Sequence, residues 1–132
     1  MKMSVEIKKA MEVLGYEQFT KVQEEVLPLL MENKNVIVKS KTGSGKTAAF
    51  AIAMLEKIDW DKKYPQALVL TCTRELAMQI KEEIALLGKY KKVKVQSVIG
   101  KENIENQKAL LKQQCHVVVA TPGRLLDLIK QD

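Results

Sequence analysis

The sequence has 132 residues, of which 46% are hydrophobic and 29% are charged. This size and composition fit a soluble globular protein of one domain or less. No apolar run reaches the ~18 residues that a membrane helix needs, and the first residues lack the apolar core of a signal peptide. We therefore expect a cytoplasmic protein in which Cys72 and Cys115 are reduced, ordinary apolar residues that bind no metal.

The formal net charge of +6 favours an anionic partner such as nucleic acid. Aromatic residues make up only 5% of the chain, which argues against recognition of unpaired bases by stacking. If nucleic acid binds, we expect the contacts to be mainly with its backbone.

Apolar spacing predicts two helices at the start of the chain, over residues 4–14 and from Lys21 to about Glu32. Four apolar runs of strand length follow, at Val36–Val38, Ala67–Leu70, Val93–Ile99 and Val117–Ala120. A helix-like segment separates each pair of runs, which predicts an α/β fold with a parallel sheet flanked by helices. Three runs are apolar throughout, as expected of strands covered on both faces, whereas the third run alternates and is predicted to lie nearer an edge.

A phosphate-binding loop follows the first run and leads into a helix-like segment. Its sequence is Ser40-Lys41-Thr42-Gly43-Ser44-Gly45-Lys46-Thr47. A glycine-rich turn between a strand and a helix directs backbone N–H groups and the positive end of the helix dipole at a polyphosphate. Lys46 is then expected at the β- and γ-phosphates and the Thr47 hydroxyl at Mg²⁺. The alternative, a turn with a surface lysine and a capping threonine, is disfavoured by the strand–loop–helix context.

Parallel sheets bind ligands at the carboxyl ends of their strands, so the residues after each run should share one rim. The candidates after the second, third and fourth runs are Thr73, Arg74, Gly100, Thr121, Gly123 and Arg124. The two threonines can cap the helices that follow. Each arginine falls in the first turn of a helix, where the dipole disfavours a cation, and this suggests a bound anion nearby.

Four stretches resemble motifs of DEAD-box ATP-dependent RNA helicases. The phosphate loop is similar to motif I, Thr73-Arg74-Glu75-Leu76-Ala77-Met78-Gln79 to motif Ia, and Ala120-Thr121-Pro122-Gly123-Arg124 to motif Ib. Residues 15–23 resemble the Q motif, which implies that Gln23 recognises adenine, with Tyr16 and Thr20 beside the nucleotide. From the residues alone, a capping box in which Gln23 bonds back to the Thr20 N–H is the alternative.

The resemblance implies a truncated P-loop NTPase domain of the RecA-like type, with ATP and Mg²⁺ as cofactors. It implies RNA as the partner, bound through its sugar–phosphate backbone at the six rim residues, and Lys46 and Thr47 as catalytic residues of the parent enzyme. The acidic motif II would fall beyond Asp132. Residues 1–132 are therefore interpreted as the N-terminal part of the first RecA-like domain, without motifs II and III or the second RecA-like domain. We do not expect this fragment to hydrolyse ATP.

In the RecA-like fold the strands of motifs II and III belong to the sheet. Their absence should leave apolar strand edges open, so we predict self-association, a rearranged edge or modest stability.

Several residues depart from the family pattern. Phe19 and Cys72 replace prolines, Ser40 replaces the first glycine of motif I, and Gly100-Lys101 replaces a pair of glycines. The Gly-Lys pair and the loop at Lys39–Thr42 most resemble a bacterial branch that acts on large-subunit ribosomal RNA.

Two other functions stay open from the sequence. One is another P-loop enzyme, such as a small-molecule kinase, which leaves motifs Ia and Ib unexplained. The other is a non-catalytic module that binds RNA or a partner, against which the intact Gly45 and Lys46 argue.

Overall fold

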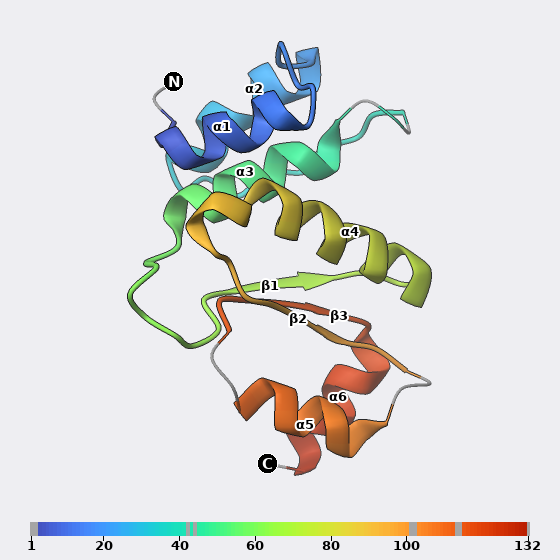
Figure 1. Cartoon of the computed structure of the whole chain (residues 1–132). Coiled ribbons are helices and arrows are strands. Elements are labelled where there is room, and N and C mark those ends of the chain that lie inside the picture. The colour runs from blue at the N-terminus through green and yellow to red at the C-terminus, as the bar shows by residue number, and fades with distance from the viewer. Residues whose placement is uncertain (1–2, 42, 44, 101–102, 113–114, 132) are drawn as a thin grey trace.

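A small parallel sheet lies at the centre of the molecule (Figure 1). The computed structural model describes residues 3–41, 43, 45–100, 103–112 and 115–131. The sheet contains β1 (Ala67–Leu70), β2 (Val95–Val98) and β3 (Val117–Ala120) in the spatial order β1-β3-β2, which confirms the predicted parallel α/β fold. β3 is central and buried along its whole length, and β2 lies at an edge, as its alternating sequence predicts.

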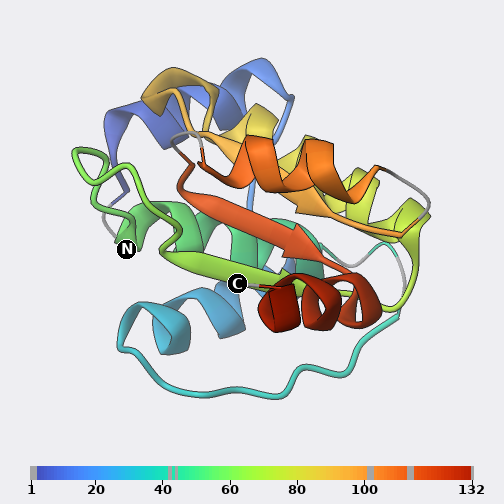
Figure 2. The same ribbon diagram turned by 90° about the horizontal axis from the view of Figure 1, so that it is seen from below.

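Helices cover both faces of this sheet (Figures 1 and 2). One face carries α4 (Arg74–Leu87), with α3 (Lys46–Lys57), α2 (Lys21–Met31) and α1 (Val5–Val13) stacked outside it. The other face carries α5 (Ile104–Lys112) and α6 (Pro122–Gln131), and a one-turn 3-10 helix, η1 (Lys89–Lys91), joins α4 to β2. Within the described ranges, no helix combines the length and the apolar character needed to cross a membrane.

The sheet separates two hydrophobic cores, and β3 contributes to both. Val117 and Val119 belong to the larger core with α1–α4, whereas Val118 and Ala120 belong to the smaller core with α6. This division follows from the period of two along a strand. Cys115 is buried in the smaller core, and burial raises the pKa of its thiol, as expected of an inert apolar cysteine.

The helices begin where the sequence predicts. α1 follows Ser4, whose hydroxyl accepts a hydrogen bond from the Ile7 N–H (3.4 Å) and donates one to Glu56 (2.8 Å). α4 follows Thr73, whose hydroxyl oxygen accepts from the Leu76 N–H at 3.1 Å. Such caps stabilise a helix by about 1 kcal/mol each.

The predicted strand at Val36–Val38 is wrong. The segment is irregular and runs outside the sheet on the far side of α2 (Figure 2), and Ile37 is fully exposed. Val36 and Val38 instead line an apolar cavity of about 470 Å³ between α2, α3 and α4. A strand needs a hydrogen-bonded neighbour, and none of the strands in the described chain pairs with this segment.

The prediction that β1 is covered on both faces is also wrong. Val69 packs against the larger core, but Leu68 and Leu70 are 52% and 55% exposed on the opposite face. β1 pairs only with β3 among the described strands, so its other edge is open.

We predict that the chain self-associates through the open edge of β1, because unpaired strands with exposed apolar side chains pair with further chains. Replacing Leu68 and Leu70 by lysine should shift the population to monomer in concentration-dependent light scattering. Because both side chains are exposed, the free energy of unfolding should change by no more than about 0.5 kcal/mol per substitution. Met78→Lys, at a residue of α4 with 54% exposure, is the matched control. A wild-type chain that stays monomeric at every concentration would contradict the prediction.

His116 is a fully buried titratable group at the amino end of β3. Its Nδ1 accepts a hydrogen bond from the Lys94 N–H at 3.1 Å, and its ring meets Trp60 edge-on with 5.2 Å between centroids. Burial lowers the pKa of His116 below 6.5; the charges of Lys63 and Lys94 lower it further, and the Trp60 carbonyl opposes the shift.

We predict that acid destabilises the fold through His116, the single histidine of the chain. The unfolded state takes up the proton near pH 6.5, before the folded state does. The free energy of unfolding should therefore fall as the pH drops from about 6.5 towards the lower folded-state pKa, by at most about 1.4 kcal/mol per pH unit. Urea unfolding between pH 5 and 8 measures this slope. His116→Asn should flatten it, and an unchanged slope in that variant would disprove the assignment.

Candidate functional site

The phosphate loop meets α3 at Gly45, and only glycine fits there. Gly45 has φ 91° and ψ 20°, in the left-handed region that glycine adopts without strain. A Cβ atom at this position would lie 2.5 Å from Nε2 of Gln23 and 3.0 Å from the Thr20 hydroxyl oxygen. The backbone conformation and the close packing at position 45 therefore both require glycine.

Gln23 joins the start of α2 to this loop. Its Oε1 accepts from the Thr20 N–H at 3.0 Å, and its own N–H donates to the Thr20 hydroxyl oxygen at 3.3 Å. Its Nε2 also donates to the Gly45 carbonyl at 3.2 Å, and the side chain is only 6% exposed. The capping box is thus confirmed, and recognition of adenine by Gln23 stays a prediction.

Lys46, the first residue of α3, reaches back across the loop. Its Nζ donates a hydrogen bond to the Ser40 carbonyl. Ser40 and Thr47 are half-buried and Lys41 is exposed, whereas the predicted Thr42 and Ser44 lie outside the described residues. A phosphate oxygen would compete with the Ser40 carbonyl for the Lys46 ammonium group.

A cavity of about 610 Å³ opens at the loop, within the size range of small-molecule sites. It brings together most of the predicted nucleotide residues with three further side chains and one alanine. The lining residues are Tyr16, Gln18, Thr20, Gln23, Gly43, Gly45, Lys46, Thr47, Ala48, Leu76 and Glu83.

Four of these lining residues, Gln18, Ala48, Leu76 and Glu83, were not predicted to bind nucleotide, and Leu76 and Glu83 come from a helix outside the loop and the Q motif. They lie seven positions apart on α4, which is two helical turns, so they share one face. Glu83 accepts a hydrogen bond from the Tyr16 hydroxyl at 3.3 Å. Burial raises the pKa of Tyr16, and the Glu83 charge and hydrogen bond raise it further. The i, i+7 spacing on α4 was visible in the sequence, but only the fold shows that this face meets the loop.

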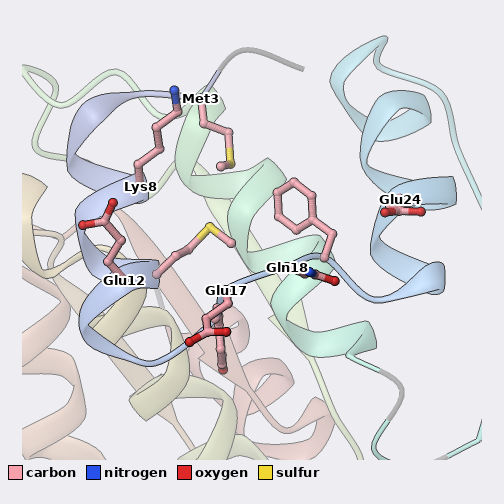
Figure 3. A pocket seen from close by; sticks show the side chains of 9 residues that line it. Met3, Lys8, Glu12, Glu17, Gln18 and Glu24 are labelled. Atoms are coloured by element: carbon pink, nitrogen blue, oxygen red, sulfur yellow. The ribbon is translucent and has the colours of Figure 1, made fainter.

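A second cavity, of about 430 Å³, is shown in Figure 3. It shares Tyr16 and Gln18 with the first cavity. Its apolar wall includes Phe19, the residue that replaces the family's proline. Its charged side chains are Lys8, Glu12, Glu17 and Glu24. This excess of carboxylates repels a polyphosphate, so the cavity at the loop is the better phosphate site.

The three described strands end at one edge of the sheet, as predicted for the rim. The Thr71 N–H donates to the Ala120 carbonyl at 3.1 Å, and the Thr121 N–H donates to the Val98 carbonyl at 2.9 Å. These bonds hold the segment after β1 to the end of β3, and the segment after β3 to the end of β2. A Cβ atom at Gly100 or at Gly123 would meet nothing within 4 Å, so the space beside both glycines is open.

The two rim arginines differ in their surroundings. The Arg74 side chain forms no hydrogen bond or ion pair with any other residue that the structure describes. Nη1 of Arg124 donates to Oε1 of Gln107 at 2.9 Å. Gln107 was missed by the sequence analysis; its only signal is its place three residues after Ile104, on the face of α5 that packs against the sheet.

The described side chains do not form a metal site of their own. Among the described side chains there is no group of three or more histidine, cysteine, aspartate or glutamate residues that could hold a metal ion. The Thr47 hydroxyl oxygen suits Mg²⁺ that is held mainly by phosphates and water.

The chain matches known proteins over most of its length. The DEAD/DEAH box helicase family model matches residues 20–132. The chain is 52% identical over 128 residues to the ATP-dependent RNA helicase DbpA of Bacillus subtilis, covering 97% of this chain and 27% of that protein. It is 44% identical over 129 residues to the DEAD-box ATP-dependent RNA helicase CshA of Geobacillus kaustophilus, covering 98% and 28%. The chain thus spans about a quarter of the length of these curated relatives.

Solved structures show the same fold. A DEAD box protein from Methanococcus jannaschii superposes with a TM-score of 0.92 at 37% identity, covering 99% of this chain and 36% of that chain. Dbp5 from S. cerevisiae, in a structure bound to RNA and ADP BeF3, gives a TM-score of 0.87 at 36% identity, covering 98% and 32%. The predicted RecA-like α/β fold is confirmed.

We predict that Gly45→Ala destabilises the protein by about 2 kcal/mol, because the new Cβ adds backbone strain and overlaps Gln23. Gly43→Ala is the matched control, since Gly43 has φ 86° but nothing within 4 Å of its Cβ position. The free energies of unfolding of both variants, measured in urea, separate the cost of backbone strain from the cost of the overlap with Gln23. Equal losses would show that the contact with Gln23 contributes nothing.

Proposed function

Because the chain belongs to the DEAD/DEAH box helicase family, we propose that it supplies the nucleotide site and part of the RNA site of a cytoplasmic ATP-dependent RNA helicase. In this proposal residues 1–132 are the N-terminal part of the first RecA-like domain. The acidic motif II, motif III and a second RecA-like domain complete the enzyme, which couples ATP binding and hydrolysis to the opening of RNA duplexes.

The observation that supports this proposal best is the cavity at the phosphate loop. The Lys46 ammonium group lies at its wall, and the α3 N-terminus directs the positive end of the helix dipole at the same place. On nucleotide binding, Lys46 exchanges the Ser40 carbonyl for phosphate oxygens. Mg²⁺, held by Thr47 and the phosphates, would neutralise charge on the β- and γ-phosphates.

Gln23 can bind adenine without giving up its internal hydrogen bonds. A carboxamide has two N–H donors and an oxygen with two lone pairs, and one of each serves Gly45 and Thr20. The remaining donor and lone pair match an adenine edge, which offers both an N–H and a ring nitrogen. The capping bonds therefore fix the orientation of the side chain for base recognition.

RNA is proposed to lie along the rim at the carboxyl ends of the strands. The open space at Gly100 and Gly123 lets a sugar–phosphate backbone approach the chain closely. Arg74 and Arg124 supply positive charge, and Thr73 and Thr121 supply hydroxyl and backbone groups at the starts of α4 and α6. The bacterial resemblance makes large-subunit ribosomal RNA the first RNA to test.

We predict that the chain binds a fluorescent ADP with Mg²⁺. Lys46→Ala should weaken binding about 10- to 100-fold, because a charged hydrogen-bond donor to phosphate is lost. Lys39→Ala, at an exposed lysine just before the loop, should leave the affinity nearly unchanged. Equal losses in the two variants would contradict the assignment of the loop.

Gln23→Glu tests adenine recognition separately from capping. The glutamate keeps an oxygen for the Thr20 N–H and loses the amide N–H groups. Competition by ADP and GDP should show an adenine preference in the wild type that the variant lacks. A wild-type protein that binds GDP as tightly as ADP would refute the assignment to the Q motif.

A further inference from the structure

Gln107 is a buried side chain that connects two parts of the rim. It lies on α5 and is 1% exposed. Its Nε2 donates to the carbonyl of Ile99 at 2.8 Å, and its Oε1 accepts from Nη1 of Arg124 at 2.9 Å. Ile99 directly precedes Gly100, so one carboxamide contacts the chain beside the proposed glycine contact and the side chain of a proposed arginine contact.

This arrangement is directional and costly to disturb. A carboxamide has a donor end and an acceptor end, and here each end meets a partner of the opposite kind. Removing the amide would leave the Ile99 carbonyl and the Arg124 guanidinium without these bonds in a place that water reaches poorly. The separation between the end of β2 and the start of α6 is therefore tied to the orientation of one buried side chain.

The position of Arg124 shows what the two hydrogen bonds of Gln107 contribute. Arg124 lies in the first turn of α6, where the helix dipole repels a cation. The Gln107 oxygen offsets part of this repulsion and holds the guanidinium before any RNA binds. Arg74 also lies in the first turn of its helix, α4, and its side chain has no such contact within the described chain. Binding through Arg74 must therefore order a side chain that binding through Arg124 finds already placed.

We infer that Gln107 is a positioning residue for RNA. It aligns Arg124 with the backbone at Gly100, so that these two groups can contact two places on the same RNA strand. Gln107 itself does not touch the RNA. The inference rests on the proposed function, since it assumes that the rim binds RNA. It predicts that the effect of Gln107 on RNA affinity is transmitted through Arg124 and not through Arg74.

The test is a pair of double-mutant cycles in the full-length protein, with Gln107→Met as the variant that keeps the size of the side chain and removes both hydrogen bonds. The equilibrium constants measured are those for a fluorescent single-stranded RNA and for fluorescent ADP. Gln107→Met should weaken RNA binding about tenfold and leave ADP binding unchanged. In steady-state kinetics it should raise the KM for RNA and leave kcat at saturating RNA unchanged.

The double-mutant cycles show which arginine transmits the effect of Gln107 on RNA affinity. In an Arg124→Ala background Gln107→Met should have almost no further effect on RNA affinity, whereas in an Arg74→Ala background its full effect should remain. If Gln107→Met does not fold, Gln107→Glu serves instead, since it keeps an oxygen for Arg124 and loses the N–H for Ile99; it should also weaken RNA binding and spare ADP binding.

The outcomes separate this inference from the proposed function. If the wild-type protein binds no RNA, the proposed function fails and the inference fails with it. If the wild type binds RNA and a folded Gln107 variant binds it equally well, only the inference is overturned. A lower unfolding temperature with unchanged RNA affinity, or a Gln107 effect that persists without Arg124, would likewise show that Gln107 serves packing alone.

Discussion

The hydrogen bond from Gln23 to the Gly45 carbonyl joins two segments that are 22 residues apart in the sequence. It forms only because Gly45 has no Cβ, which lets the carboxamide approach the turn. Gln23 is itself held by the capping box at the start of α2. Gly45 and the start of α3 are thus held against the N-terminal end of α2, and Gln23 and Gly45 both line the cavity at the loop.

The sheet provides the second constraint. Because β3 alternates between the two cores, its backbone is held from both faces, and its ladder with β1 and β2 aligns the strand ends at the rim. The glycines and arginines of the rim lie on loops and in first helical turns that this scaffold positions. The space beside Gly100 and Gly123 is open, and the ends of the strands lie next to both glycines. This arrangement suits the close approach of the RNA sugar–phosphate backbone that is proposed to bind there.

The sequence predicted what local chemistry determines and missed what depends on neighbours. Capping at Thr20 and Thr73, the edge position of β2 and the burial of β3 could all be read from spacing and residue type. Val36–Val38 is as apolar as Val117–Val119, yet only the second forms a strand, because pairing depends on a partner elsewhere in the chain. Gln107 carried almost no signal, since a buried glutamine looks like any other polar residue in a helix.

The rim arginines show how an argument from sequence changes once packing is known. The helix dipole disfavours a cation at Arg74 and at Arg124 alike, and a bound anion was one explanation for both. For Arg124 the Gln107 oxygen already offsets part of the repulsion, so its place in the helix is by itself weaker evidence for an external anion. For Arg74 no internal partner is found in the described part of the chain, and the argument for an anion keeps its force. If RNA binds the rim as proposed, the two arginines should contact its phosphates differently, Arg124 through a preformed contact and Arg74 through one that orders on binding.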